Sequence, residues 1–154
     1  MSLNLYEYDE ENNQYLTISE DGLQSNPVQT THDGTNGEIV EKKLFLQNSD
    51  PNVYYTNITL QAKPDSKVRV GDINYPEAFI GFKIMFKESQ PSQSEWASIE
   101  SGNVEHISNI GTTEMADTSY KPVWIQVSIP GGTKVGAFRD ISIDLICEQN
   151  PLGA

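Results

Sequence analysis

Cysteine and positive charge are what this chain has least of. Its 154 residues include one cysteine, Cys147, which excludes a disulfide within the chain and leaves too few thiolates for a structural zinc site. Lys and Arg number 10 against 22 Asp and Glu, a formal net charge of −12. A surface of that sign repels nucleic-acid phosphates and anionic lipid headgroups. We therefore expect neither nucleic acid nor a membrane among its partners.

Long apolar runs and helix formers are scarce as well. No segment approaches the roughly 20 apolar residues that a membrane-spanning helix needs. The first residues, MSLNLYEYDEENNQ, are acidic where a signal peptide is basic and then apolar. Ala and Leu are sparse, and no window has the apolar period of 3.6 residues that indicates an amphipathic helix. We expect very little helix, in a protein that stays soluble where it is made.

Strand-like and turn-like segments alternate along the rest of the chain. Runs with period-two alternation are separated by the turn formers NSDPN, KPDSK, SQPSQS and PGGT. This spacing is typical of an antiparallel sandwich or barrel. The pattern predicts an all-β fold with strands near 39–48, 53–62, 78–88, 95–99, 104–110, 121–129 and 138–148. NSDPN is expected to be the turn that joins two adjacent antiparallel strands.

The alternation also predicts which side chains share a face, because successive residues of a strand point to opposite sides of its sheet. The expected inward sets are Val123, Ile125, Val127 and Ile129; Ile141, Ile143, Leu145 and Cys147; Ile80, Phe82, Ile84 and Phe86; and Tyr54, Thr56, Ile58, Leu60 and Ala62.

Residues 1–25 differ from the rest. LNLYEY and QYLTIS are β-prone but separated by the polar DEENNQ, which predicts a hairpin, and a long polar segment follows. We divide the chain into an N-terminal arm or hairpin at 1–25 and a β-sandwich at 26–154. As an arm, the hairpin would add strands to a neighbouring subunit. The alternative is that it supplies ordinary strands of one larger sandwich.

Catalytic and metal-binding patterns are weak. His32 and His106 lack the spacing of a paired metal or nucleophile motif. DGTNGE at 33–38 has oxygen donors and glycine, but its third and fifth positions, Thr35 and Gly37, break the pattern of a calcium loop. An adventitious cation there is the only metal we allow for. Asp140 and Asp144 share a sheet face, as a glycosidase pair would, yet nothing else in the sequence supports that chemistry. We expect no enzyme activity, no catalytic residue, no cofactor and no metal site.

Large aromatic and apolar side chains on the surface are the more informative signal. If Ile84 and Phe86 fill the core, their neighbours on the strand point outward, and Trp124 does so on its own strand. Outward side chains of this kind are typical of protein interfaces. We assign a partner-binding surface to Tyr6, Tyr8, Tyr15, Phe79, Met85 and Trp124. The alternative is that the arm folds back and covers these side chains.

Three segments carry a resemblance: LFLQNSDPNVYYTNITLQAKPD, WASIESGNVEHISNI and PVWIQVSIPGGTKVGAFRDISIDL. Their pattern, over residues 38–148, resembles the immunoglobulin-like modules of tailed-phage virion proteins and of some bacterial surface proteins. It lacks the Cys-Trp-Cys constellation of antibody domains. The resemblance implies an immunoglobulin-like β-sandwich that decorates a capsid, tail or baseplate through protein contacts.

Together these observations predict a non-enzymatic structural protein of a bacteriophage virion, made in the host cytoplasm. Its expected partners are other virion proteins or copies of itself, in a homo-oligomer or another symmetric assembly. The alternative function is a module that binds carbohydrate or a host receptor, with Trp124, Trp96 or Tyr120 as platforms for sugars.

Overall fold

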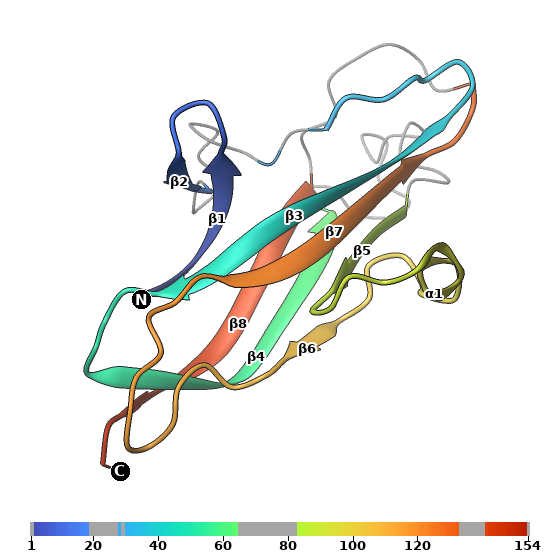
Figure 1. Cartoon of the computed structure of the whole chain (residues 1–154). Helices are drawn as coiled ribbons and strands as arrows, with labels where there is room; N and C mark the ends of the chain where they lie inside the picture. Colours follow the sequence, from blue (N-terminus) through green and yellow to red (C-terminus); the bar gives the residue numbers. More distant parts are fainter. Residues whose placement is uncertain (1, 19–27, 29, 65–82, 133–140, 154) are drawn as a thin grey trace.

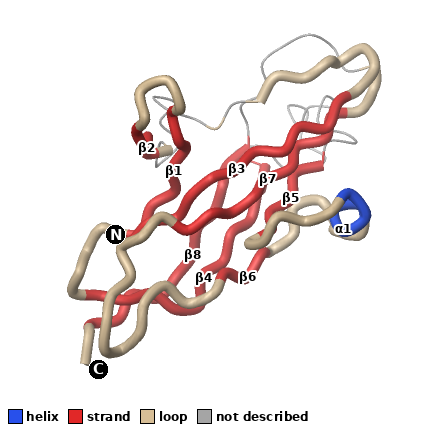
Figure 2. The backbone as a smooth tube through the Cα atoms, viewed as in Figure 1, coloured by secondary structure: helices blue, strands red, loops and turns tan. Residues whose placement is uncertain are grey.

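The computed structural model describes residues 2–18, 28, 30–64, 83–132 and 141–153. Over these residues the chain is an antiparallel β-sandwich of two sheets, as predicted (Figures 1 and 2). The larger sheet has five strands in the order β2-β1-β3-β7-β5, and the smaller sheet has three in the order β6-β4-β8. The elements are β1 (Leu3–Asp9), β2 (Gln14–Thr17), β3 (Glu38–Asn48), β4 (Val53–Pro64), β5 (Lys83–Lys87), α1 (Gln93–Ala97), β6 (Glu105–Ile107), β7 (Lys121–Ile129) and β8 (Ile141–Pro151).

The hydrophobic core lies between the sheets. Leu44 and Val123 of the larger sheet and Ile58 and Leu60 of the smaller sheet are almost fully buried there. Ile129, at the end of β7, is half-buried and is not part of this core. The predicted inward alternation is confirmed for three residues of β7 and three of β8, which are buried in this core or pack against it. They are Val123, Ile125 and Val127 on β7, and Ile143, Leu145 and Cys147 on β8.

The turn NSDPN does not join paired strands, so that prediction is wrong. β3 ends at Asn48 in the larger sheet, and β4 begins at Val53 in the smaller sheet. The fully buried Asn48 side chain holds this arch: its Nδ2 donates to the carbonyls of Asp50 and Val53, both at 3.0 Å. Its Oδ1 accepts from the Asp50 amide at 2.9 Å. Turn chemistry determines that the chain reverses, but not whether the two strands hydrogen-bond to each other.

A bulge in β4 changes the face on which its side chains lie. Thr56 pairs with Glu148 but Thr59 pairs with Ile146, so two residues oppose one, and Asn57 has a φ of 50°. Ile58 is therefore buried on the same side as Tyr55, and the inward set continues after the bulge with Leu60 and Ala62. The prediction that Tyr54 and Thr56 share the inward face with these residues is wrong, because a strict period of two cannot pass through a bulge.

Residues 95–99, predicted as a strand, instead include the end of helix α1. Ser92 is its N-cap: the Ser92 hydroxyl accepts from the Glu95 amide at 3.3 Å and donates to Glu95 Oε1 at 3.2 Å. These contacts join the cap residue to the third residue of the helix, the Ser-x-x-Glu spacing of a capping box. The Ser-x-x-Glu spacing of SQSE at 92–95 is the signal in the sequence that indicates a helix here. The strand prediction followed the short apolar run instead.

Met85 lies on the outer face of the larger sheet, as alternation predicted, but it is only 2% exposed. The prediction that it forms part of the accessible surface is wrong. It pairs with Gln126, which is also buried, while Phe86 faces the core and is fully buried. The period of a strand determines the face of a side chain, but not whether another segment covers that face.

Residues 2–18 form the predicted hairpin, and it belongs to the larger sheet. β1 pairs with β3, and Leu3, Leu5 and Ile18 are buried in the common core. Ser2 is bound to the buried Tyr55, with 2.6 Å between their hydroxyl oxygens. Of the two interpretations left open by the sequence, this arrangement is the one in which the hairpin supplies strands of the chain's own sandwich. Residues 19–27, and hence the boundary at 25–26, lie outside the described part.

Candidate functional site: an aromatic face on the larger sheet

Strand pairing places a group of aromatic side chains on the outer side of the larger sheet. Residues that pair directly across antiparallel strands point to the same face. Tyr6 pairs with Phe45, and Tyr8 pairs with Tyr15. Trp124 lies two residues beyond Pro122, the β7 partner of Phe45, and therefore faces the same way. We call the following set the aromatic face: Tyr6, Tyr8, Tyr15, Phe45, Tyr120 and Trp124. It spans β2, β1, β3 and β7, which lie next to one another in the sheet (Figure 1).

Tyr15 is at the centre of the ring contacts on this face. Its ring stacks on Tyr120 with centroids 3.5 Å apart and planes 6° apart. It also meets the ring of Phe45 edge-on at 5.2 Å, and the ring of Tyr8 at 4.9 Å. Tyr6 meets Tyr120 edge-on at 5.4 Å. Burial raises the pKa of Tyr120, and the nearby phenols of Tyr6 and Tyr15 add to this effect. The rings are thus held by one another before any partner arrives.

Lys43 joins this cluster to Trp124. Its Nζ lies 5.3 Å from the ring centroid of Phe45 and 5.5 Å from that of Trp124, within the range of cation–π contacts. Trp124 has Lys43 as its strand partner on one side and Lys87 on the other. Lys87 Nζ is 3.7 Å from Glu105, whereas Lys43 is exposed and has no carboxylate within ion-pair distance among the described residues. A protein with a net charge of −12 thus presents a cation beside its surface tryptophan.

The structure brings together four of the six residues assigned to the partner-binding surface: Tyr6, Tyr8, Tyr15 and Trp124. Met85 is buried, and Phe79 lies outside the described residues. Phe45 was missed, although it lies between Leu44 and Leu46 on a β-prone run, where alternation places it on the face opposite to these two buried leucines. Of the proposed sugar platforms, Trp96 is only 3% exposed and cannot serve, whereas Tyr120 and Trp124 are half-buried parts of the aromatic face.

The aromatic side chains remain partly accessible, although Tyr15 of the hairpin packs on Phe45 and Tyr120. Tyr8 is 40% exposed, and the other members of the aromatic face are half-buried. Their ring contacts are with one another, and Lys43 lies over Phe45 and Trp124. The hairpin contributes three tyrosines to the surface.

The histidines and the 33–38 loop serve local structure. His32 Nε2 lies 2.8 Å from Thr30 Oγ1, and its Nδ1 lies 3.1 Å from the Glu38 carbonyl oxygen. Asp33 accepts from the amides of Thr35 and Asn36 and from the Asn36 side chain, so its carboxylate closes its own turn. His106 is exposed on β6 opposite Thr59. Across the described residues no three His, Cys, Asp or Glu side chains are grouped so that they could hold a metal ion.

The remaining candidates for chemistry are the Gly131-Gly132 turn, Asp140 and Cys147. Gly132 donates to the Thr35 carbonyl at 3.1 Å, so the Gly131-Gly132 turn packs against the 33–37 turn. Asp140, the predicted partner of Asp144, lies outside the described residues. Cys147 is half-buried beside the core, and burial raises the pKa of its thiol. Within the described part, no helix has the length and apolar character needed to cross a bilayer.

A surface hollow of about 620 Å³ lies in the loop before β7, lined by residues that include Gly111, Thr112 and Met115. The one titratable side chain of its lining is Asp117, which is already bound to Lys121 and Ser119. Asp117 lies 2.6 Å from Lys121 Nζ, and this contact, with the Ser119 hydrogen bonds, lowers the pKa of the carboxyl to about 2. A carboxyl with a pKa this low is ionised at neutral pH, and with Lys121 and Ser119 bound to it, it is a poor general acid or base there.

Comparison of the chain with protein-family models, curated proteins and solved structures found no match in any of the three. Function is therefore inferred from the residues themselves.

Proposed function

We propose that the chain is a non-enzymatic binding module that contacts partner proteins through the aromatic face of its larger sheet. The observation that carries this proposal is the contiguous set of partly exposed rings, Tyr6, Tyr8, Tyr15, Phe45, Tyr120 and Trp124, on neighbouring strands. Tyr and Trp are enriched in protein interfaces and dominate their binding energy. The setting we propose is a tailed-phage virion, as a capsid decoration, tail or baseplate component, in line with the resemblance of residues 38–148.

Preorganisation of the rings supports this function. A side chain that is ordered only on binding costs about 0.5–1.5 kcal/mol of rotamer freedom. Tyr15 is already fixed by Tyr120 on one side and by Phe45 and Tyr8 on others. Most of that cost is therefore met during folding, so burial against a partner stabilises the complex more fully. Aromatic rings with phenol groups also offer hydrogen bonds at the rim of such a contact.

The charge beside Trp124 defines the chemistry of the partner. Lys43 is exposed next to the indole, and Lys87 lies across from it on β5. We propose that the partner surface combines an apolar group, which contacts the rings, with a carboxylate that faces Lys43. Attraction between such exposed charges is screened at high salt, so association should weaken as ionic strength rises.

Site-specific photo-crosslinking in the producing cells tests this proposal. A photoreactive phenylalanine derivative would replace Tyr8, a 40% exposed ring of the aromatic face, and in a matched variant it would replace Ile146, which is 61% exposed on β8 of the smaller sheet. We expect the Tyr8 position to yield a discrete protein adduct that the Ile146 position does not. No adduct at Tyr8, or equal adducts at both positions, would contradict the proposal. Identification of the adduct as a virion protein tests the phage setting separately.

A second candidate is carbohydrate binding, favoured by the exposed edge of the aromatic face at Tyr8 and by the half-buried Trp124. Sugar rings pack their C–H faces on aromatic rings, and both residues are accessible for such stacking. A glycan array separates the candidates. Saturable glycan binding that Trp124→Ala abolishes, without a protein adduct at Tyr8, would favour this function over protein binding.

A further inference from the structure

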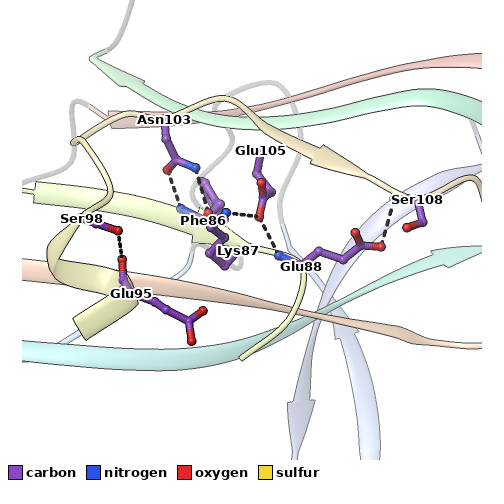
Figure 3. Close-up of polar contacts among 8 residues, drawn as sticks. All are labelled: Phe86, Lys87, Glu88, Glu95, Ser98, Asn103, Glu105 and Ser108. Carbon is purple, nitrogen blue, oxygen red and sulfur yellow. Dashed lines mark hydrogen bonds and ion pairs between the residues drawn. The ribbon is translucent and has the colours of Figure 1, made fainter. Parts of the chain in front are cut away.

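β5 is an edge strand of the larger sheet in the described part of the chain, yet its outward backbone groups are bonded. The amide of Ile84 donates to Ser101 Oγ at 3.2 Å, that of Phe86 to Asn103 Oδ1 at 2.9 Å, and that of Glu88 to Glu105 Oε2 at 2.9 Å. Figure 3 shows Asn103 and Glu105 reaching the backbone at Phe86 and Glu88. The side chains of Ser101, Asn103 and Glu105 thus lie where the main chain of an added strand would lie.

The spacing of these bonds matches that of a strand. The acceptors Ser101, Asn103 and Glu105 advance by two residues, and so do their donors, Ile84 and Phe86 on β5 and Glu88 directly after it. This segment therefore runs parallel to β5. Asn103 both accepts from Phe86 and donates its Nδ2 to the Phe86 carbonyl at 2.9 Å. Its side-chain amide carries the same donor and acceptor as a peptide group. The Gly102 amide supplies a further bond, to the Ile84 carbonyl at 2.7 Å.

The same segment is bonded to the smaller sheet. Gln61 Nε2 of β4 donates to the Gly102 carbonyl at 2.9 Å, and Glu105 is the first residue of β6. Just after β5, the Glu88 side chain bonds to the residue that follows β6: its Oε1 accepts from the Ser108 amide at 2.9 Å (Figure 3). Residues 101–105 therefore close the side of the sandwich between β5 and β6, with contacts to both sheets.

We infer that residues 101–105 form an edge cap that occupies the strand-addition site of β5 and prevents this strand from pairing with β5 of a second copy. An edge strand presents unpaired amides and carbonyls that attract another strand, and covering them is one way in which proteins avoid edge-to-edge association. In an assembly that holds many copies at high local concentration, such pairing would compete with contacts through the aromatic face. The inference concerns a different surface and does not depend on the proposed function.

Hydrogen exchange measured by NMR, residue by residue, tests the cap in two variants. Asn103→Ala removes both bonds to Phe86. Ser101→Ala removes the bond to the Ile84 amide and keeps both Asn103 bonds, so it is the second variant if the first folds poorly. We expect exchange at the corresponding outward amide to rise ~tenfold or more, while the Met85 amide, which faces β7, is unchanged. Asn109→Ala, in the exposed loop after β6, is the matched control.

The second readout is association. At rising protein concentration, Asn103→Ala should form dimers in sedimentation velocity, and the Ile84 and Phe86 amides should regain protection as they pair with a second copy. Three results would overturn the inference: fast exchange at Phe86 in the wild-type protein, a variant that stays monomeric with Phe86 unprotected, and dimers that leave the β5 amides unprotected. Each is measured without any assumption about the natural partner.

Discussion

Tyr15 and Tyr120, which are far apart in the sequence, stack with their ring centroids 3.5 Å apart and their planes within 6° of parallel. Tyr15 lies on the N-terminal hairpin, and Tyr120 directly precedes β7. The stack therefore joins the outer strand of the larger sheet to a segment on the other side of β3, and it fixes the rings of the aromatic face. It is at once a contact within the fold and part of the proposed binding surface.

The Tyr15–Tyr120 stack should be energetically coupled. Tyr15→Ala and Tyr120→Ala should each lower the free energy of unfolding by about 1–3 kcal/mol, with a coupling of about 0.5–1.5 kcal/mol in a double-mutant cycle. Urea denaturation of the two single variants and the double variant measures both quantities. Tyr8→Ala is the control for the loss of a more exposed ring. Strict additivity of the two substitutions would show that the stack does not stabilise the fold.

Removal of the hairpin should unfold the domain. The assembly-arm interpretation predicted that a chain beginning at Asn26 keeps a cooperative melt. The structure leads us to expect the opposite, because Leu3, Leu5 and Ile18 are buried in the core. Leu3→Ala alone should cost about 2–5 kcal/mol, whereas Leu16→Ala, at a residue 37% exposed, should cost much less. Calorimetry of the truncated chain and of the two variants distinguishes a hairpin that belongs to the core from an assembly arm. A cooperative melt of the truncated chain near the wild-type temperature would favour the assembly arm.

Local pattern predicted most strands of the fold but not how they combine. The alternation predicted the inward faces of 123–127 and 143–147 correctly because those segments are regular. Around residues 48–53 the sequence predicted a turn but not the change of sheet, where Ser2, far away in the chain, bonds to both Asn48 and Tyr55. For the site, alternation found Trp124 and the three hairpin tyrosines. It could not show that they meet, because only tertiary pairing brings β1 next to β3.

The bulge at Asn57 should be sensitive to backbone conformation. Its φ of 50° lies in the left-handed region, which Gly and Asn adopt at little cost and β-branched residues adopt poorly. Asn57→Gly should leave stability within a few tenths of a kcal/mol, whereas Asn57→Val should cost about 1–3 kcal/mol. The Asn57 side chain is exposed, so a lost core contact cannot explain a difference. Equal stability of the two variants in urea would contradict this assignment of the bulge.

Acid should weaken the loop before β7 through Asp117. The pKa of this carboxyl is lowered from 3.8 to about 2 by Lys121 and Ser119. A lowered pKa in the folded state stabilises it at pH values above the unfolded pKa, and that contribution is lost as pH falls through the folded pKa. The loss should thus occur between about pH 4 and pH 2. Turn hydrogen bonds also lower the pKa of Asp9 and Asp33, so the informative quantity is the difference between wild type and variant.

Asp117→Asn isolates that difference. Its melting temperature should lie below that of the wild type at pH 6, and the gap should close toward pH 2. Lys121→Met should show the same convergence, because it removes the other half of the ion pair. A gap that is constant from pH 6 to pH 2 would mean that the ionised carboxylate does not stabilise the loop.

Hydroxyl-radical footprinting of the native assembly against the isolated chain tests the binding role of the aromatic face most directly. We predict that Trp124 and Tyr8 are oxidised in the isolated chain and protected in the assembly. Met115, 71% exposed in the loop before β7, should be oxidised in both, and the buried Met85 should be protected in both. Equal oxidation of Trp124 and Tyr8 in the two states would contradict the assignment of the aromatic face as the binding surface.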